Sequence, residues 1–144
     1  MTDNQYEAKE WLNRMFKMAQ DIEATKRTLE TILAEMGGVA KYEQSFGSQN
    51  PKASETKLLR YSQVSKELDQ KLNQLYEEDV QTIRVINKLD NPQYKAILRD
   101  RYINHLSWHK IAQLHSYSEA RLYELHRDAL EAIWEFIPGK NGNV

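Results

Sequence analysis

The sequence contains no cysteine, only three prolines and five glycines in 144 residues, and no long apolar run. Without cysteine the chain forms neither disulfide bonds nor cysteine-ligated zinc sites, which suits a reducing compartment. So few turn-forming residues leave little room for a fold of many short strands. The apolar runs fall far short of the roughly 20 residues that span a membrane. Residues 1–20 are charged throughout and lack the apolar segment of a secretory signal, so we expect a soluble protein of the cytoplasm.

The chain also lacks an excess of positive charge, because 20 Lys and Arg face 21 Asp and Glu, for a net charge of −1. A domain that binds DNA mainly through phosphate contacts usually carries a clear basic excess. The patterns of an enzyme are missing as well: there is no catalytic triad, no carboxylate pair set in a cleft, no phosphate-cradling glycine loop and no cofactor fingerprint. We therefore expect a protein without catalytic activity and without a cofactor.

Residues 5–36 are predicted to form one long amphipathic helix. Apolar side chains recur there every seven residues, and most are followed by a second apolar residue three positions later, which is the pattern of a coiled coil. Thr25 is the one polar interruption. The heptad positions are Ala8, Met15, Ile22, Leu29 and Met36. The glycine pair at residues 37–38 ends the helix.

A second long helix is predicted for residues 54–89, with Ser54 as its N-terminal cap. The glycines, proline and small polar residues of 37–54 predict a loop between the two helices. Two amphipathic helices joined by a loop fold back most simply as an antiparallel, coiled-coil-like hairpin, here over residues 1–90. Their apolar stripes are wider than a single helix pair covers, so we expect a homodimer or a higher homo-oligomer.

Three shorter helices are predicted in residues 91–138. Capping residues and apolar periodicity place them at residues 92–103, 107–114 and 118–137, with residues 115–117 as the joint between the last two. The capping residues are Asn91, Ser107 and Ser118. Pro92 suits the first helical position, where the missing N–H is not needed. The pattern is that of a three-helix helix-turn-helix domain in an all-α protein, and residues 139–144 are expected to be a disordered tail.

The segment "YKAILRDRYINHLSWHKIAQLHSYSEARLYELHRDAL" (94–130) resembles region 4 of bacterial sigma factors, which binds the promoter −35 element. The segments "YEAKEWLNR" (6–14), "RYINHLSW" (101–108) and "LYELHRDAL" (122–130) are similar to small proteins of phages and prophages of Gram-positive bacteria, related to the ArpU and RinA late regulators. This resemblance implies a transcriptional regulator of phage late genes that binds double-stranded promoter DNA in the bacterial host cell, with host RNA polymerase as a further partner.

The sequence departs from the resembled pattern at several positions. Ser116 stands in the turn, and His105 before the second helix, where glycine is common in the family. A left-handed residue other than glycine costs of order 1 kcal/mol. Glu119, Ala120 and Glu124 occupy positions of the last helix where the family often has Arg, Lys or Thr. These departures bear on the strength of DNA binding rather than on the fold.

The last helix is the predicted recognition helix. Its periodicity turns Leu122, Leu125 and Ala129 toward the core, and it turns the six side chains of Glu119, Ala120, Arg121, Tyr123, Glu124 and Arg127 outward. Side chains in the first turns of a recognition helix meet base edges, where Arg suits guanine and Glu accepts from cytosine. The candidate DNA-contacting residues are Ser107, Lys110, Ser118, Glu119, Ala120, Arg121, Tyr123, Glu124 and Arg127.

Two other interpretations remain open for this helix: an ordinary solvated surface, or a module that binds polymerase or another protein without contacting DNA. A positive stripe along Lys110, Arg121 and Arg127 would favour DNA, and a neutral one would favour a protein. Residues 92–137 contain six Lys and Arg and six Asp and Glu, so their net charge is zero. All four histidines also lie there, and their protonation below pH 7 is expected to make the segment basic. We expect useful affinity to come from two copies or from polymerase.

His105 and His109 stand four residues apart, the spacing at which two histidines of a helix chelate a metal. His105 precedes the capping Ser107, however, and no third ligand is placed nearby, so no metal site is predicted. Trp108 is expected to be a core residue, packed under the first helix of the motif, and Trp11 and Trp134 are expected to be packing or interface residues.

Overall fold

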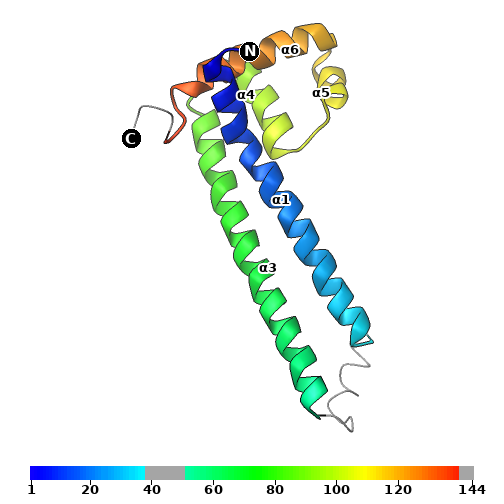
Figure 1. Cartoon of the computed structure of the whole chain (residues 1–144). Coiled ribbons are helices and arrows are strands. Elements are labelled where there is room, and N and C mark those ends of the chain that lie inside the picture. Colours follow the sequence, from blue (N-terminus) through cyan, green and yellow to red (C-terminus); the bar gives the residue numbers. More distant parts are fainter. Residues whose placement is uncertain (38–50, 140–144) are drawn as a thin grey trace. The chain divides into compact units, whose positions relative to one another are not determined.

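The computed structural model describes residues 1–37 and 51–139 (Figure 1). Its elements, in chain order, are the helices α1 (Asp3–Glu35), α3 (Pro51–Ile86) and α4 (Pro92–Leu98), the π-helix η1 (Arg99–Ile103), and the helices α5 (Trp108–His115) and α6 (Glu119–Trp134). The described residues contain no strand, so the prediction of an all-α fold is confirmed. The predicted loop at residues 37–54 and the predicted tail at 139–144 lie largely outside the described residues.

The contacts of the chain group it into two compact units. One unit contains residues 1–16 and 77–144, and we call it the helix-turn-helix unit; the other contains residues 17–76, and we call it the hairpin unit. The sequence pattern predicts a division at residue 90. The structural grouping instead places the first turns of α1 with the C-terminal helices, because these turns bury apolar side chains in the helix-turn-helix unit. Those side chains are Ala8, Leu12 and Met15, and all three are fully buried.

The hairpin unit consists of two antiparallel helices. Asp21 of α1 pairs with Lys71 of α3 (2.9 Å), and Glu35, further along α1, pairs with Arg60, further back on α3 (3.0 Å). The polar interruption at Thr25 has a structural reason: the buried hydroxyl accepts a hydrogen bond from Lys71 Nζ (2.9 Å) and donates one to the Asp21 carbonyl (2.9 Å). The long Lys71 side chain thus crosses the hairpin and satisfies a hydroxyl that burial would otherwise penalise.

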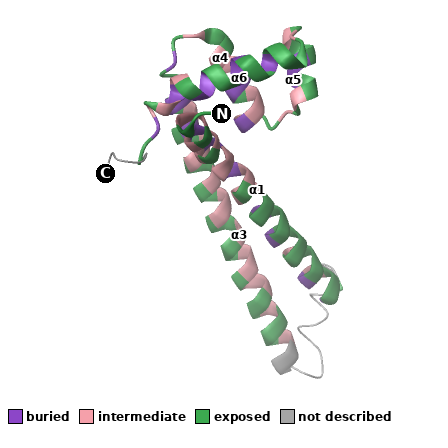
Figure 2. Cartoon of the chain, turned by 45° about the horizontal axis from the view of Figure 1, so that its top comes forward, coloured by how far each residue is buried: buried purple, intermediate pink, exposed green. Residues whose placement is uncertain are grey.

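The two helices of the hairpin unit differ in how far they are buried: in Figure 2 the part of α1 in this unit carries purple bands, whereas α3 is pink and green over residues 54–76. Ile22 and Ile32 of α1 are buried, whereas the apolar residues of α3 in this unit remain half-buried or exposed. The half-buried residues are Leu58, Tyr61, Val64, Leu68, Leu72 and Leu75. A single partner helix therefore leaves part of the α3 stripe accessible, as the sequence predicts.

Several predicted helix ends are wrong by a few residues. Helix α3 begins at Pro51 rather than Ser54, which agrees with the preference of proline for a first helical turn. Helix α3 also ends earlier, because from Lys88 onward the amides bond three residues back, as Leu89 does to the Ile86 carbonyl (3.1 Å). Helix α6 ends at Trp134 rather than at residue 137, because Glu135 and Phe136 form a turn.

The predicted helix at residues 92–103 is two elements. Asn91 caps α4 as predicted, accepting from the amides of Gln93 (2.8 Å) and Tyr94 (3.3 Å), and Pro92 occupies the first position. After Leu98 the chain widens into η1, in which the Asn104 amide bonds to the Arg99 carbonyl five residues back (2.9 Å). A short π-helix of this kind changes the direction of the side chains that follow it.

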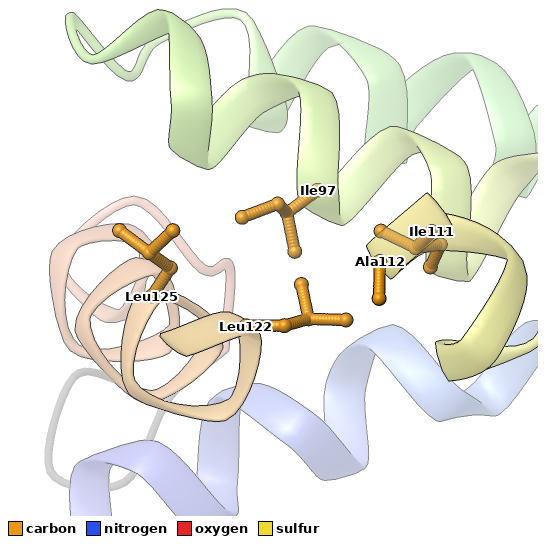
Figure 3. Packing of buried hydrophobic residues seen from close by; sticks show 5 residues of the cluster. All are labelled: Ile97, Ile111, Ala112, Leu122 and Leu125. Carbon is orange, nitrogen blue, oxygen red and sulfur yellow. The ribbon is translucent and has the colours of Figure 1, made fainter. Parts of the chain in front are cut away.

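The core of the helix-turn-helix unit joins α4, α5 and α6. Figure 3 shows five buried side chains meeting between these helices: Ile97, Ile111, Ala112, Leu122 and Leu125. Tyr94, Leu106, Trp108 and Tyr117 pack against the edge of this cluster. Because Leu122 and Leu125 both belong to α6, the cluster holds one side of that helix against the protein and leaves the opposite side exposed.

Candidate nucleic-acid interface

Serine side chains cap both helices of the motif. Ser107 has an extended backbone, and its hydroxyl accepts from the Lys110 amide (3.1 Å). Ser118 does the same for α6, accepting from the Arg121 amide (3.1 Å). Both serines are exposed. The predicted caps are confirmed, and each hydroxyl satisfies one of the unpaired amides at a helix start.

The turn between α5 and α6 passes through Ser116, which has left-handed backbone angles (φ 58°, ψ 39°). The following amide, that of Tyr117, bonds to the Ala112 carbonyl (3.0 Å), which closes the end of α5. His115 precedes the turn, pairs with Asp100 of η1 (2.8 Å) and stacks on the Tyr117 ring. The predicted turn is confirmed, and side-chain contacts hold it on both sides in place of the usual glycine.

A second left-handed residue, His105 (φ 56°), lies between η1 and α5. Its ring packs edge-on against Phe16 of α1, with 4.7 Å between the ring centres. The preceding Asn104 donates from its side chain to Asp100 Oδ1 (3.0 Å), while Asp100 Oδ2 is the oxygen that faces His115. One carboxylate thus joins both left-handed corners of the motif. Periodicity did not single out Asp100, because its two contacts depend on the fold.

The inner and outer sides of α6 are those that the periodicity predicts. The predicted core residues Leu122, Leu125 and Ala129 are buried, together with His126 and Leu130. Figure 2 shows the outer side of α6 in green. The predicted contact residues on α6 are all exposed, and these are Glu119, Ala120, Arg121, Tyr123, Glu124 and Arg127. Lys110 on α5 is exposed as well.

Ion pairs partly neutralise the outer side of the motif. Arg121 pairs with Glu124 one turn later (3.0 Å), and His109 Nδ1 lies 3.8 Å from Glu119 Oε1. All four side chains are more than half exposed, so each pair contributes little free energy and a ligand can replace it at small cost. Among the described residues, no carboxylate pairs with Lys110 or Arg127.

His126 differs from the other three histidines because it is buried, with 5% of its surface exposed. Its Nε2 forms a hydrogen bond with the hydroxyl of buried Tyr102 (2.8 Å). Burial, assisted by the nearby cations Lys9, Arg101 and Arg127, lowers the pKa of His126 to about 4. The ring is therefore neutral at pH 6 to 7, and the prediction that all four histidines add positive charge is wrong for His126.

Trp11 and Trp134 pack against other side chains as predicted, whereas Trp108, which was predicted to lie in the core, packs at the edge of the core cluster. Trp108 is half-buried, with its ring edge-on to His126 (4.5 Å between centres) and Arg101 stacked over it at 4.6 Å. Trp134 donates from Nε1 to Glu7 of α1 (2.9 Å). The guanidinium of Arg14 covers the Trp11 ring.

The part of the chain that the structure describes contains no group of three His, Cys, Asp or Glu side chains placed to hold a metal ion. His105 and His109 belong to different segments, His105 before Ser107 and His109 inside α5. No helix of the described residues is long and apolar enough to cross a lipid bilayer.

Comparison with known proteins returns one family. A family model with the description "Protein of unknown function (DUF1492)" matches residues 56–133, more than half of the chain. No curated protein and no solved structure matches the sequence. The matched range contains most of α3, all of α4, η1 and α5, and all but the last residue of α6.

Proposed function

We propose that this chain, which belongs to the DUF1492 family, binds double-stranded DNA by placing α6 in the major groove. The observation that carries the proposal is the pairing of α5 and α6. Each helix has a serine cap, a left-handed turn at Ser116 joins them, and Ile111 and Leu122 anchor them to a shared core. A recognition helix needs such a rigid mount with its outer side accessible, because its first turns have to enter the groove.

The outer side of α6 offers distinct contacts along its length. Arg121 lies in the first turn, where its guanidinium can form two hydrogen bonds with guanine. Glu124 can accept from cytosine once the exposed pair with Arg121 opens, which costs little. Arg127 lies almost two turns beyond Arg121 and is suited to a phosphate, as is Lys110 on α5.

The near-neutral charge of the motif bears on how the protein works. A single copy with few unpaired cations gains little from phosphate contacts, so we propose that binding is bivalent, through two copies joined by their long helices. The resemblance to phage late regulators supports a role in transcription at a promoter, with contact to host RNA polymerase. The protein is then a regulator in the host cell rather than an enzyme.

Selection of bound duplexes from a random double-stranded library tests DNA recognition by the full chain. We expect a short enriched motif, and two half-sites if two copies bind together. Fluorescence anisotropy on the enriched duplex and on a scrambled duplex then measures the preference. A library that remains random after several rounds, with equal affinity for both duplexes, contradicts the proposal.

Alanine variants of Arg121 and Arg127 separate base contacts from phosphate contacts. Arg121→Ala is expected to lose about 1 to 3 kcal/mol on the selected duplex and little on the scrambled one. Arg127→Ala is expected to weaken both duplexes equally and to flatten the salt dependence. The matched control is Arg27→Ala, an exposed arginine of the hairpin unit. If both α6 variants bind as the wild type does, α6 is not the recognition helix.

A second candidate function is binding of another protein by the same motif. Two observations favour it: the ion pairs at Arg121 and His109 leave the surface near neutral, and Leu114 of α5 is 56% exposed. An exposed leucine beside neutralised charges is a common feature of protein contacts. This function replaces the first one if the selection finds no DNA motif and host RNA polymerase retains the purified protein, with Leu114→Glu abolishing that retention.

A further inference from the structure

Three cations from three separate elements gather beside α6 in the helix-turn-helix unit. They are Lys9 of α1, Arg101 of η1 and Arg127 of α6, and we call them the basic cluster. The start of α1 lies on α6, because Gln5 Nε2 donates to the Arg127 carbonyl (3.2 Å). Lys9 follows Gln5 by four residues and so lies on the same side of α1. None of the predicted contact residues belongs to α1, so Lys9 is new to the interface.

Arg101 is the member of the basic cluster whose side chain is held by aromatic and backbone contacts. Arg101 stacks on the Trp108 ring and donates to the Leu106 carbonyl (3.0 Å), so its position is fixed. Trp108 in turn packs on His126. Lys9 and Arg101 are half-buried, and Arg127 is exposed. The cluster is therefore partly sheltered from water on one side and accessible on the other.

The charges of the described residues that act on the pKa of His126 are all of one sign. The charges that lower the pKa of His126 come from Lys9, Arg101 and Arg127, and all three are positive. In the described part of the chain, no carboxylate pairs with Lys9 or Arg127. Like charges held together at a half-sheltered surface repel each other, and a bound anion removes that repulsion. The cluster therefore favours an anionic ligand.

We propose that the basic cluster binds a phosphate of the DNA backbone next to the groove that α6 occupies, and that Lys9 is the ligand contributed by α1. The inference rests on the proposed function, since Arg127 belongs to the recognition helix. Lys9 suits the task because lysine carries a compact charge on a flexible stem, whereas Arg101 is held in place and contributes mainly its field. The first turns of α1 then act as part of the DNA-binding surface.

Salt-dependent anisotropy with the full chain tests the role of Lys9. Lys9→Ala is expected to weaken the selected and the scrambled duplex by the same factor, because a phosphate contact is independent of sequence. One lost contact changes the slope of log affinity against log salt by about 0.9, so between about 50 and about 200 mM salt the variant loses about 3.5-fold less affinity than the wild type. Lys9→Arg keeps the charge and is expected to retain both the affinity and the slope.

Lys17→Ala is the matched control, because it removes an exposed lysine of the same helix in the hairpin unit. If Lys9→Ala has the wild-type affinity and slope while Arg121→Ala still loses base preference, the inference is overturned and the proposed function stands. If Lys9→Ala and Lys9→Arg lose affinity alike with an unchanged slope, Lys9 is structural and the inference is again overturned. If the wild type binds no duplex, the proposed function fails and the inference fails with it.

Discussion

At the scale of single residues, the helix-turn-helix unit depends on polar side chains placed inside or beside its core. Tyr102 and His126 form a buried pair that joins η1 to α6, and burial raises the pKa of Tyr102 while it lowers that of His126. Both groups are therefore neutral near pH 7, as a buried hydrogen-bonded pair needs to be. Asp100 has the matching role at the surface, where it joins His115 to Asn104.

The pKa of His126 predicts how stability depends on pH. The folded ring has a pKa of about 4 against its ordinary value of 6.5, so between these values the unfolded chain binds a proton that the folded protein excludes. The contribution of the neutral ring to the free energy of unfolding is fully present above pH 6.5 and is lost as the pH falls toward 4. The total loss is at most about 3 kcal/mol. Urea unfolding at pH 7, 6 and 5 measures it. His126→Gln keeps a hydrogen-bonding side chain without titrating, and its stability is expected to fall less over the same range; an equal fall contradicts the assignment.

The two left-handed residues predict different responses to glycine. Ser116→Gly removes the strain at φ 58° and is expected to leave the stability unchanged or to raise it by up to about 1 kcal/mol. His105→Gly removes similar strain but also the contact with Phe16, so the gain is expected to be smaller or negative. Thermal unfolding of both variants makes the comparison. A clear loss of stability in Ser116→Gly would show that its side chain, rather than the backbone conformation, holds the turn.

At the scale of elements, the position of α6 follows from what its neighbours bury. In the core shown in Figure 3, the first two turns of α6 pack against α4 and α5. The π-helix η1 adds contacts with α5 and with the segment before it. Asp100 forms a hydrogen bond with His115, and Arg101 donates to the Leu106 carbonyl and stacks on the Trp108 ring. Helices α4 and α5, of 7 and 8 residues, are too short to be stable alone in water, so these contacts, more than helix propensity, hold them in place.

Core substitutions test this dependence on packing. Ile111→Ala and Leu122→Ala are each expected to cost about 2 to 4 kcal/mol, because both side chains are fully buried and truncation leaves a cavity. Leu114→Ala is the matched control on α5, where the side chain is 56% exposed and the expected change is within about 0.5 kcal/mol. Urea unfolding compares the three variants. Similar costs for Ile111→Ala and Leu114→Ala would contradict the orientation of α5.

At the scale of the whole molecule, α1 and α3 each contribute residues to both compact units. In the hairpin unit the apolar residues of α3 remain partly accessible, and Leu59 and Tyr76 are each 58% exposed. Large exposed apolar side chains on a long helix are typical of surfaces that bind another chain. The proposed DNA binding by a short motif of near-neutral charge gives a reason for such an interface, since linking two binding modules raises their joint affinity for a duplex.

Self-association through the hairpin unit is the prediction at this scale. Sedimentation equilibrium of the full chain at micromolar concentration is expected to give a dimer, or a higher homo-oligomer. Tyr76→Lys is expected to shift the equilibrium toward monomer, because it places a charge on the apolar surface. Asn73→Lys, at an exposed polar position of the same helix, adds the same charge as a control. A monomeric wild-type chain contradicts the prediction.

Local signals in the sequence were enough to predict the helices of the motif, their capping residues and the sides of the helices that face the core. Asn91, Ser107 and Ser118 cap the helices that they precede, and Leu122, Leu125 and Ala129 face inward as the periodicity predicts. The left-handed turn at Ser116 was also predictable, by the resemblance of its surroundings to a known motif. A cap or a helical stripe involves residues no more than a few positions apart, so it can be predicted from the sequence alone, even though tertiary contacts hold these helices in place.

Contacts between distant segments were decided only by the tertiary structure. Periodicity does not distinguish a buried His126 from a surface histidine, because its burial depends on Tyr102 and Trp108 arriving from other elements. The same holds for Lys9, which the sequence separates from Arg127 by more than one hundred residues and which α1 brings to α6. A side chain acquires its charge state and its neighbours only when the core that surrounds it has closed, since burial and Coulomb interactions act between residues that are near in space rather than in sequence.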